Sequence, residues 1–344
     1  MSMADTSPQF FATVPMALVE HLPRNVVAVV GVIFAALVVG TALRLASLAR
    51  TKDAAKARQR TGSLITWWVL FVLMTLVVVL GRTAAILAFA VISGLGLHEF
   101  RRLANRRIST AHLGHWAYAA VPIHYLLIYF GDFAAVWTFI PVWVLGILLV
   151  QLVVNGETDA FLEITGIMFL GLMLTVYLLS HAVLLFAIPA SPQYPAGATG
   201  LFVFLILLTE SNDIAQALWG RRFGRRQIAP RVSPHKTWEG FLLAAVTTTL
   251  LSCLLAPWLT PYASVPDNFL GAVFRVPYAA ALVVGPLIAV GGFFGDITIS
   301  AIKREVGVKD SGDLLPGQGG VLDRIDSLMF TAPLLFYFTF LAFD

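Results

Sequence analysis

The residues best suited to chemistry lie in one polar stretch near the end of the chain, residues 295–328. It holds five aspartates and four basic residues, although the whole chain is 58% hydrophobic and only 12% charged. Carboxylates bind Mg²⁺, which completes its coordination shell with water and substrate phosphate oxygens, and basic side chains bind phosphates. The stretch therefore predicts a site for a divalent cation and a phosphorylated substrate. Its aspartate, lysine and arginine residues are Asp296, Lys303, Arg304, Lys309, Asp310, Asp313, Asp323, Arg324 and Asp326.

The spacing inside this stretch fits such a site. Asp323 and Asp326 are three residues apart, so both carboxylates share one face if 321–328 is helical. The glycine-rich turn 316–320 permits backbone conformations that a β-carbon forbids, and such turns can bring N–H groups close to phosphates. We therefore expect carboxylates, cations and a phosphate-binding loop to converge here.

A second polar stretch follows an apolar segment. Asp213 lies near the end of the apolar run 198–219, where a carboxylate is costly and indicates a function. Further on, the run 233–240 reads Ser-Pro-His-Lys-Thr-Trp-Glu-Gly, in which Ser-Pro favours a turn and Thr237 suits the start of a helix. Lys236 would then face an anion at that helix N-terminus. The alternative is a capped helix behind a basic loop that only sets membrane topology.

The elements that must position these residues are membrane-spanning helices. A mean hydropathy of +0.84 over 344 residues predicts an all-α, polytopic integral membrane protein with nine or ten transmembrane helices. The two segments around Gly81 are short enough to form either one broken helix or a tight hairpin. The expected spans are 25–46, 64–80, 83–97, 115–130, 134–154, 163–187, 198–219, 238–259, 277–298 and 328–343.

The basic residues predict how the helices are oriented. With ten spans, the four basic loops fall on one side, which is then cytoplasmic, with both termini outside. We expect a bacterial inner-membrane protein without a cleaved signal peptide, whose active site faces the cytoplasm. The polar residues of 295–328 fall in one of these loops rather than at mid-membrane, which favours an enzyme over a transporter. The basic loops are 50–60, 101–107, 221–236 and 303–324.

The chain divides into three expected regions. Residues 1–63 form a tail, the first transmembrane helix and a basic cytoplasmic loop, and residues 64–197 form a transmembrane helical region. Residues 198–344 form a catalytic transmembrane region whose cytoplasmic loops carry both polar stretches. The single cysteine, Cys253, lies in an apolar span and indicates no disulfide, metal or redox site.

The residues of both stretches resemble the signature of the CDP-diacylglycerol synthases, also called phosphatidate cytidylyltransferases. The first match is Ser300-x-x-Lys303-Arg304, Lys309-Asp310 and the run 316–326, Pro-Gly-x-Gly-Gly-x-x-Asp-Arg-x-Asp. The second comprises Asp213-x-x-Ala, a Gly-x-x-x-Gly loop and the 233–240 run. Gln318 stands where most family members have histidine, His235 replaces a lysine, and Gln216 a frequent tyrosine.

The resemblance implies transfer of a cytidylyl group from CTP to phosphatidate, giving CDP-diacylglycerol and pyrophosphate for phospholipid biosynthesis. It implies Mg²⁺ as cofactor and leaves a second cation open. In the expected site Asp296 and Asp323 hold the metal, with Asp326 and Asp310 in support. Catalytic roles fall to Lys303, Arg304, Lys309, Asp310, Gln318, Arg324 and Asp326, and substrate-binding roles to Asp213, Ser233, Lys236 and Thr237.

Three alternatives stay open. The replacement at Gln318 allows a diverged family member that uses another lipid phosphate, or a non-catalytic lipid-binding or scaffold protein. A transporter is the third, and it fits the clustered charges less well. The expected partners are CTP, phosphatidate and membrane lipids, without nucleic acid, and a homodimer is left open.

Overall fold

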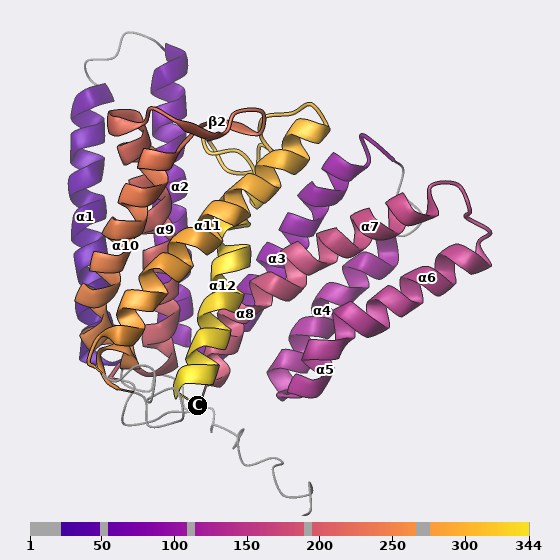
Figure 1. Ribbon diagram of the computed structural model, residues 1–344, viewed down its shortest axis with the longest axis horizontal. Helices are drawn as coiled ribbons and strands as arrows, with labels where there is room; N and C mark the ends of the chain where they lie inside the picture. Colours follow the sequence, from indigo (N-terminus) through magenta and orange to yellow (C-terminus); the bar gives the residue numbers. More distant parts are fainter. Residues whose placement is uncertain (1–21, 49–53, 109–113, 189–194, 266–275, 344) are drawn as a thin grey trace, which may run out of the picture.

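The protein is a bundle of helices that are long and apolar enough to cross a membrane. The computed structural model describes residues 22–48, 54–108, 114–188, 195–265 and 276–343 (Figure 1). Within these residues, nine helices meet the length and hydropathy of a membrane span, and Trp116–Phe130 is a shorter apolar helix. The expected all-α fold with nine or ten transmembrane helices is confirmed.

The helices follow one another with few strands between them. Two of the spans are continuous runs of short helices that include π-helical turns, η3 in 133–154 and η4 in 161–187. The elements are α1 (Arg24–Leu48), α2 (Ala54–Leu80), α3 (Arg82–Ala104), α4 (Gly114–Phe130), α5 (Phe133–Thr138), η3 (Phe139–Val144), α6 (Leu145–Val154), α7 (Phe161–Leu172), η4 (Met173–Leu178), α8 (Leu179–Leu184), η5 (Leu185–Ala187), α9 (Gly197–Phe223), β1 (Gln227–Ala229), β2 (Ser233–Thr237), α10 (Trp238–Leu259), η6 (Pro261–Ala263), α11 (Ala279–Glu305) and α12 (Leu322–Phe343).

The chain reverses at Gly81, between α2 and α3. Gly81 has a φ of 74°, in the region that favours glycine, and α2 and α3 pack against each other. A single broken helix could not fold its halves together in this way. Of the two alternatives that the sequence leaves open here, the structure has the hairpin.

Helices α9 to α12 form the part of the bundle that carries both polar stretches. Helix α10 packs against α9 and α11, and α11 packs against α12. A β-carbon at Gly295 would lie 2.2 Å from the carbonyl oxygen of Asp326, so the backbones of α11 and α12 touch at this point. Small residues allow such close approach between membrane helices.

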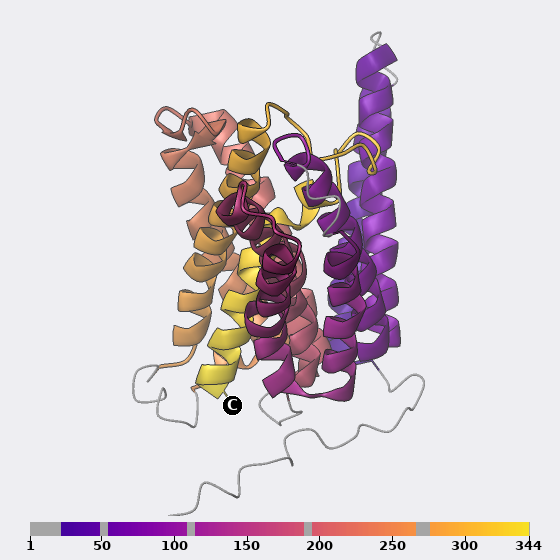
Figure 2. The ribbon, with the colours of Figure 1, turned by 90° about the vertical axis from the view of Figure 1, so that its right-hand side faces the viewer.

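The polar connections gather at one end of the bundle. The β1–β2 hairpin and the connection between α11 and α12 lie at the end away from the C-terminus (Figure 1). Figure 2 shows α1 and α2 at one edge of the bundle. The 221–236 and 303–324 connections thus share one end, as the charge pattern predicts. Most of the expected N-terminal tail, and Arg50 and Lys52 of the first basic loop, lie outside the described residues.

The 233–237 segment differs from the expected turn. Ser233 lies in β2 and pairs with Ala229 of β1, while the bend falls before it, and α10 begins at Trp238. The Ser-Pro pair is tolerated in this two-stranded ribbon because both strands are edges, where a proline breaks no ladder hydrogen bond.

Candidate active site

Three aspartates from three helices converge near the polar end of the bundle. Asp213 lies on α9, Asp296 on α11 and Asp326 on α12, and the three carboxylates interact electrostatically. A β-carbon at Gly292 would lie 3.7 Å from Oδ1 of Asp213, so α11 presents bare backbone to α9 beside this group. We call Asp213, Asp296 and Asp326 the carboxylate cluster.

Lys236 brings a positive charge from β2 into this cluster. Its Nζ lies 2.5 Å from Oδ2 of Asp296 and donates to Oε1 of Gln216 at 2.9 Å. Burial by itself lowers the pKa of Lys236, but the carboxylates of Asp296 and Asp213 outweigh it, so the pKa is raised above its ordinary value. The ammonium group is therefore firmly charged. The two polar stretches of the sequence meet in this ion pair.

Arg324 and Glu210 lie at the edge of the cluster. The guanidinium of Arg324 interacts electrostatically with Glu210, Asp213 and Asp326. Its Nε is buried and has no hydrogen-bond partner in the described part of the chain. Arg324 was predicted from the sequence, but Glu210 was given no role, because a single glutamate within an apolar helix carries no spacing signal.

Asp323 is engaged in a different set of contacts from those expected. Its Oδ1 accepts from Nζ of Lys303 at 2.6 Å. Its Oδ2 accepts from the backbone N of Ser311 at 2.8 Å, from the hydroxyl of Ser311 at 3.0 Å and from the backbone N of Gly320 at 3.0 Å. The Asp323 carboxylate thus holds the 311–320 connection against α12 through hydrogen bonds. Few of its lone pairs remain to coordinate a metal ion.

Glu99 of α3 is a residue that sequence reasoning passed over. Its buried carboxylate accepts from the backbone N of Val321 at 3.0 Å, from that of Leu322 at 2.8 Å and from the hydroxyl of Ser311 at 2.9 Å. Glu99 therefore caps the N-terminus of α12 from another helix. No spacing signal connects Glu99 with these partners, because it lies 222 residues before Val321 in the sequence.

Together these carboxylates occupy backbone N–H groups of the glycine-rich loop. The expectation was that these groups approach a phosphate. In the structure the N–H group of Gly320, the last residue of the turn 316–320, donates to Asp323. The N–H groups of Val321 and Leu322, just after the turn, donate to Glu99. The loop is a rigid support for the start of α12, on which Asp326 lies one turn further on.

The other side of the loop is held by α2. Nε2 of Gln318 donates to the backbone O of Ser63 at 3.2 Å and to its hydroxyl at 3.1 Å. The hydroxyl of Thr66 donates to the backbone O of Pro316 at 3.0 Å, and a β-carbon at Gly62 would lie 2.9 Å from that same oxygen. Gln318 therefore connects the loop to α2 through hydrogen bonds.

The remaining predicted residues lie around this core. Arg304 is exposed and donates to the backbone O of Val232 at 3.2 Å and of Val308 at 2.9 Å. The Thr237 hydroxyl accepts from the backbone N of Gly240 at 3.2 Å, so it is the N-cap of α10. Exposed positions in or beside the connection are taken by Lys309, Asp310 and Asp313, and Ser233 is half-buried in β2.

The expectation that the charges of 295–328 share one loop was wrong. Asp296 and Lys303 lie on α11, while Asp323 and Asp326 lie on α12. Both helices continue past their apolar segments because ion pairs such as Lys303–Asp323 satisfy the charges between them. The charged residues are therefore divided between the ends of α11 and α12 and the exposed connection that holds Lys309, Asp310 and Asp313.

A metal ion can be tested against these residues. Within the described ranges, no three His, Cys, Asp or Glu side chains stand in metal-binding geometry. However, Oδ1 of Asp213 is buried without a hydrogen-bond partner in the described part of the chain, beside two other carboxylates. Oxygen ligands of this kind suit Mg²⁺. The donor set of the carboxylate cluster thus fits a divalent cation, whereas the Asp323 carboxylate already accepts four hydrogen bonds.

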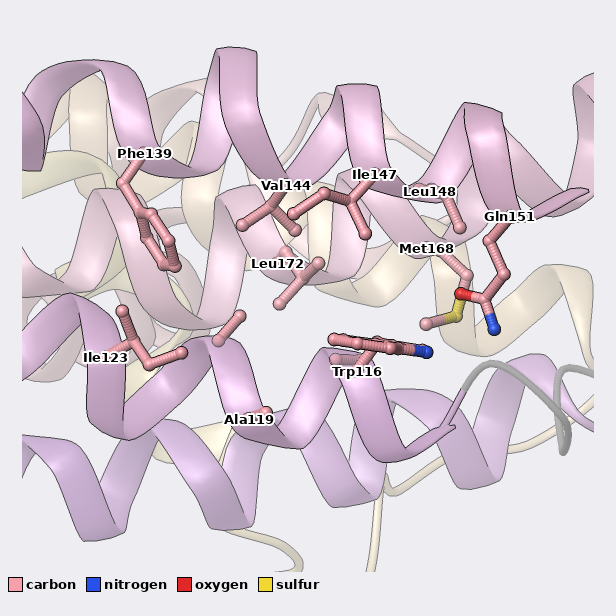
Figure 3. A pocket seen from close by; sticks show the side chains of 12 residues that line it. Trp116, Ala119, Ile123, Phe139, Val144, Ile147, Leu148, Gln151, Met168 and Leu172 are labelled. Atoms are coloured by element: carbon pink, nitrogen blue, oxygen red, sulfur yellow. The ribbon is translucent and has the colours of Figure 1, made fainter.

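A separate cavity lies between α4, the η3–α6 segment and α7 (Figure 3). Trp116 and Gln151 lie toward one end of it, and the other lining side chains are apolar (Figure 3). Among the described residues, no titratable group lines this cavity, so they offer nothing there for phosphate chemistry. The carboxylate cluster is the candidate active site.

Comparison with known proteins points in the same direction. A model of the cytidylyltransferase family matches residues 61–342. The chain is 40% identical to the uncharacterized protein YnbB of Escherichia coli over 306 residues, which cover 89% of this chain and 95% of that protein.

Several relatives carry the name phosphatidate cytidylyltransferase, and two bacterial ones serve as examples. The Haemophilus influenzae protein is 37% identical over 140 residues, 41% of this chain and 46% of that protein. The Bacillus subtilis protein is 35% identical over 141 residues, 41% of this chain and 47% of that protein. These alignments span less than half the length of the named enzymes.

Proposed function

Because the chain belongs to the cytidylyltransferase family, we propose that it transfers a cytidylyl group from CTP to phosphatidate, giving CDP-diacylglycerol and pyrophosphate. The observation that carries this proposal is the convergence of the carboxylate cluster with Lys236 and Arg324. Carboxylates and cations at the polar end of membrane helices suit a reaction between a nucleoside triphosphate and a lipid phosphate.

The proposed reaction is an in-line displacement at phosphorus. A phosphate oxygen of phosphatidate attacks the α-phosphorus of CTP, and the bond from this phosphorus to the bridging oxygen breaks as pyrophosphate leaves. The attacking oxygen is already ionised at neutral pH, so no general base is needed. Catalysis then rests on positioning and on charge neutralisation.

The carboxylate cluster is the part that would hold Mg²⁺. We assign Asp213, Asp296 and Asp326 as its protein ligands, because an oxygen of Asp213 is buried and unpaired beside the other two carboxylates. A bound divalent cation neutralises the negative charge of the phosphates and steadies the leaving oxygen. Asp323 is left as a structural residue in this proposal.

The basic side chains are proposed to bind and orient the substrates. Lys236 reaches the cluster from β2, and Arg324 approaches from α12. An arginine can grip a phosphate through two parallel hydrogen bonds. The basic connections support a cytoplasmic position for this end of the bundle, where CTP is available and the lipid phosphate lies at the membrane surface.

A second candidate is cytidylyl transfer to a different lipid phosphate. Two observations favour it. The chain aligns with YnbB over nearly all of that protein, but with the Haemophilus influenzae and Bacillus subtilis synthases over less than half of theirs. In addition, the Gln318 amide donates hydrogen bonds to Ser63 of α2. These bonds indicate that Gln318 supports the loop and does not transfer protons.

The experiment is to follow the α-phosphate of CTP into lipid. Purified protein in detergent with Mg²⁺ is given CTP labelled at the α-phosphate and either phosphatidate, lysophosphatidate or isoprenyl phosphate. The proposal predicts phosphatidate-dependent label in the organic phase and an equal release of pyrophosphate. Label that enters lipid only with another acceptor would select the second candidate. The absence of label with every acceptor would reject cytidylyl transfer to these lipid phosphates.

A further inference from the structure

A hollow on the surface lies at the base of the β1–β2 hairpin, apart from the carboxylate cluster. It is lined by Arg225, Arg226, Trp238, Glu239 and Leu242. We call these five residues the arginine hollow. None of them takes part in the ion pairs of the candidate active site.

The backbone of the arginine hollow is fixed by hydrogen bonds. Oε2 of Glu239 accepts from the backbone N of Arg225 at 2.9 Å and from that of Arg226 at 3.1 Å. The backbone N of Trp238 donates to the backbone O of Arg226 at 2.9 Å. The segment that carries both arginines is therefore held firmly against the start of α10.

The guanidinium groups themselves are free to bind a ligand. Arg225 and Arg226 are exposed, and in the described part of the chain neither guanidinium makes a hydrogen bond or an ion pair. The one acidic side chain of the hollow, Glu239, already uses an oxygen on two backbone N–H groups. The guanidinium of Arg226 also interacts electrostatically with the Glu239 carboxylate. The hollow thus offers two exposed arginines on a fixed backbone, with one carboxylate beside them.

The hollow lies where two helices of membrane-span length and hydropathy meet their polar connection. The membrane span of α9 ends at Phe223 and that of α10 begins at Trp238. Trp238 is 49% exposed, and Leu242, one turn further into the span, is 56% exposed. Tryptophan is enriched at this level of a membrane, and leucine beyond it faces hydrocarbon. One wall of the hollow is therefore cationic and the other apolar.

We propose that the arginine hollow binds an anionic phospholipid from the cytoplasmic leaflet. The headgroup phosphate lies between Arg225 and Arg226, and the acyl chains run along Trp238 and Leu242. A soluble phosphate or nucleotide would use the arginines but leave the apolar wall unused. This site is independent of the proposed cytidylyl transfer, since none of its residues lies in the carboxylate cluster.

The test uses phosphatidylglycerol, whose phosphate is a diester that cannot accept a cytidylyl group as phosphatidate does. Binding of dioleoyl phosphatidylglycerol to the purified protein in dodecyl maltoside is titrated by native mass spectrometry. An arginine near an anionic lipid surface contributes a factor of about five in affinity. We expect Arg225→Gln/Arg226→Gln to weaken binding about twentyfold and each single substitution about fivefold.

The matched control is Arg221→Gln/Arg222→Gln. These exposed arginines lie in the last turn of α9, just before the hollow. Nε of Arg221 donates to the backbone O of Ala217, and Arg222 lies over the ring of Phe223. The control removes the same charge outside the hollow, so we expect less than a twofold change. Dioleoyl phosphatidylcholine, which carries no net charge, is expected to bind wild type at least tenfold more weakly.

Several outcomes would overturn the proposal. Equal losses in both double variants would mean diffuse surface charge rather than a site. An unchanged affinity in Arg225→Gln/Arg226→Gln would exclude the arginines. Competition by glycerol 3-phosphate at the affinity of the lipid would show a soluble-phosphate site instead. If the double variant fails to fold, as judged by its melting temperature, the two single variants decide the question in the same assay.

Discussion

Lys236 of β2 and Asp296 of α11 form an ion pair of 2.5 Å that joins the two polar stretches of the sequence. The side chains are 18% and 24% exposed, so the pair is largely shielded from water. Gln216 takes a further hydrogen bond from the same ammonium at 2.9 Å, and Asp213 and Asp326 act on it electrostatically. One lysine thus balances part of the negative charge of the carboxylate cluster.

This pairing predicts a particular dependence of stability on pH. The folded-state pKa of Lys236 is raised, so the stability that its charge contributes is fully present below the unfolded pKa of about 10.4 and is lost as the pH rises through the raised value. We expect wild type to have a higher melting temperature than Lys236→Met at pH 7. The difference between the two melting temperatures should become smaller above pH 10. A difference that grows with alkaline pH would contradict the assignment. His235→Ala, exposed on the same strand, is the control and should melt like wild type.

Glu99 is expected to control the order of the loop before α12. The Glu99 carboxylate accepts three hydrogen bonds, and Glu99→Gln replaces one of its oxygens with an NH₂ group. This NH₂ group is a donor and would face the N–H or O–H donors of the loop without accepting from them. Unsatisfied buried donors cost about 1–3 kcal/mol each, so the free energy of unfolding should fall by about 2–4 kcal/mol. Hydrogen exchange of residues 311–322 should rise while that of α10 stays unchanged. Glu305→Gln, at an exposed ion pair with Arg107, should change stability by less than about 1 kcal/mol. Equal exchange in wild type and Glu99→Gln would refute the capping role.

Gln318 and Ser63 should be energetically coupled. A double-mutant cycle with Gln318→Ala and Ser63→Ala tests the hydrogen bond between the amide and the hydroxyl. A hydrogen bond contributes a net stabilisation of about 0.5–1.5 kcal/mol, and we expect a coupling energy in this range. Ser63→Ala leaves the backbone oxygen of Ser63 as an acceptor for Gln318, so the cycle reports on the bond to the hydroxyl alone. Strict additivity within about 0.3 kcal/mol would mean that Gln318 does not hold the loop against α2.

Gly295 is expected to be intolerant of a side chain. Gly295→Ala places a β-carbon 2.2 Å from the carbonyl oxygen of Asp326, a backbone atom that cannot yield unless α12 shifts. Overpacking of this kind costs about 1–3 kcal/mol or more and should move Asp326 away from Asp296, so turnover should fall together with the melting temperature. Gly166→Ala, on α7, meets no atom within 4 Å and should retain wild-type stability. Normal turnover in Gly295→Ala would show that the contact between α11 and α12 does not position the cluster.

The fold was largely predictable from the sequence, since apolar segments of span length and the distribution of arginine and lysine are local signals. The resemblance also led to the right family, as the match over residues 61–342 confirms. The extent of α11 and α12 was less predictable, because Lys303 and Asp323 look like loop residues until they are seen to pair across two helices.

The inner arrangement of the site depends on contacts between distant segments. The spacing of Asp323 and Asp326 on one helix face suggests a shared role. Asp323, however, accepts hydrogen bonds from Lys303 and Ser311, while Asp326 interacts electrostatically with Asp296. Nothing in the sequence near Glu99 indicates that it caps a helix that begins at Leu322. Such partnerships arise only from tertiary packing, so their roles stay predictions until the variants are measured.

The central claim is that the carboxylate cluster, with Lys236, is where the cytidylyl transfer takes place. The most direct measurement is the steady-state release of pyrophosphate from CTP by wild type, Asp296→Asn, Asp326→Asn and Lys236→Met, with phosphatidate and Mg²⁺ in detergent. Asp313→Asn, at an exposed position in the α11–α12 connection, is the control. We predict that each cluster variant loses at least about a hundredfold in kcat/KM, about 2.7 kcal/mol of transition-state stabilisation, while Asp313→Asn stays within twofold. An active wild type whose turnover survives Asp296→Asn and Asp326→Asn would place the reaction elsewhere and contradict this account.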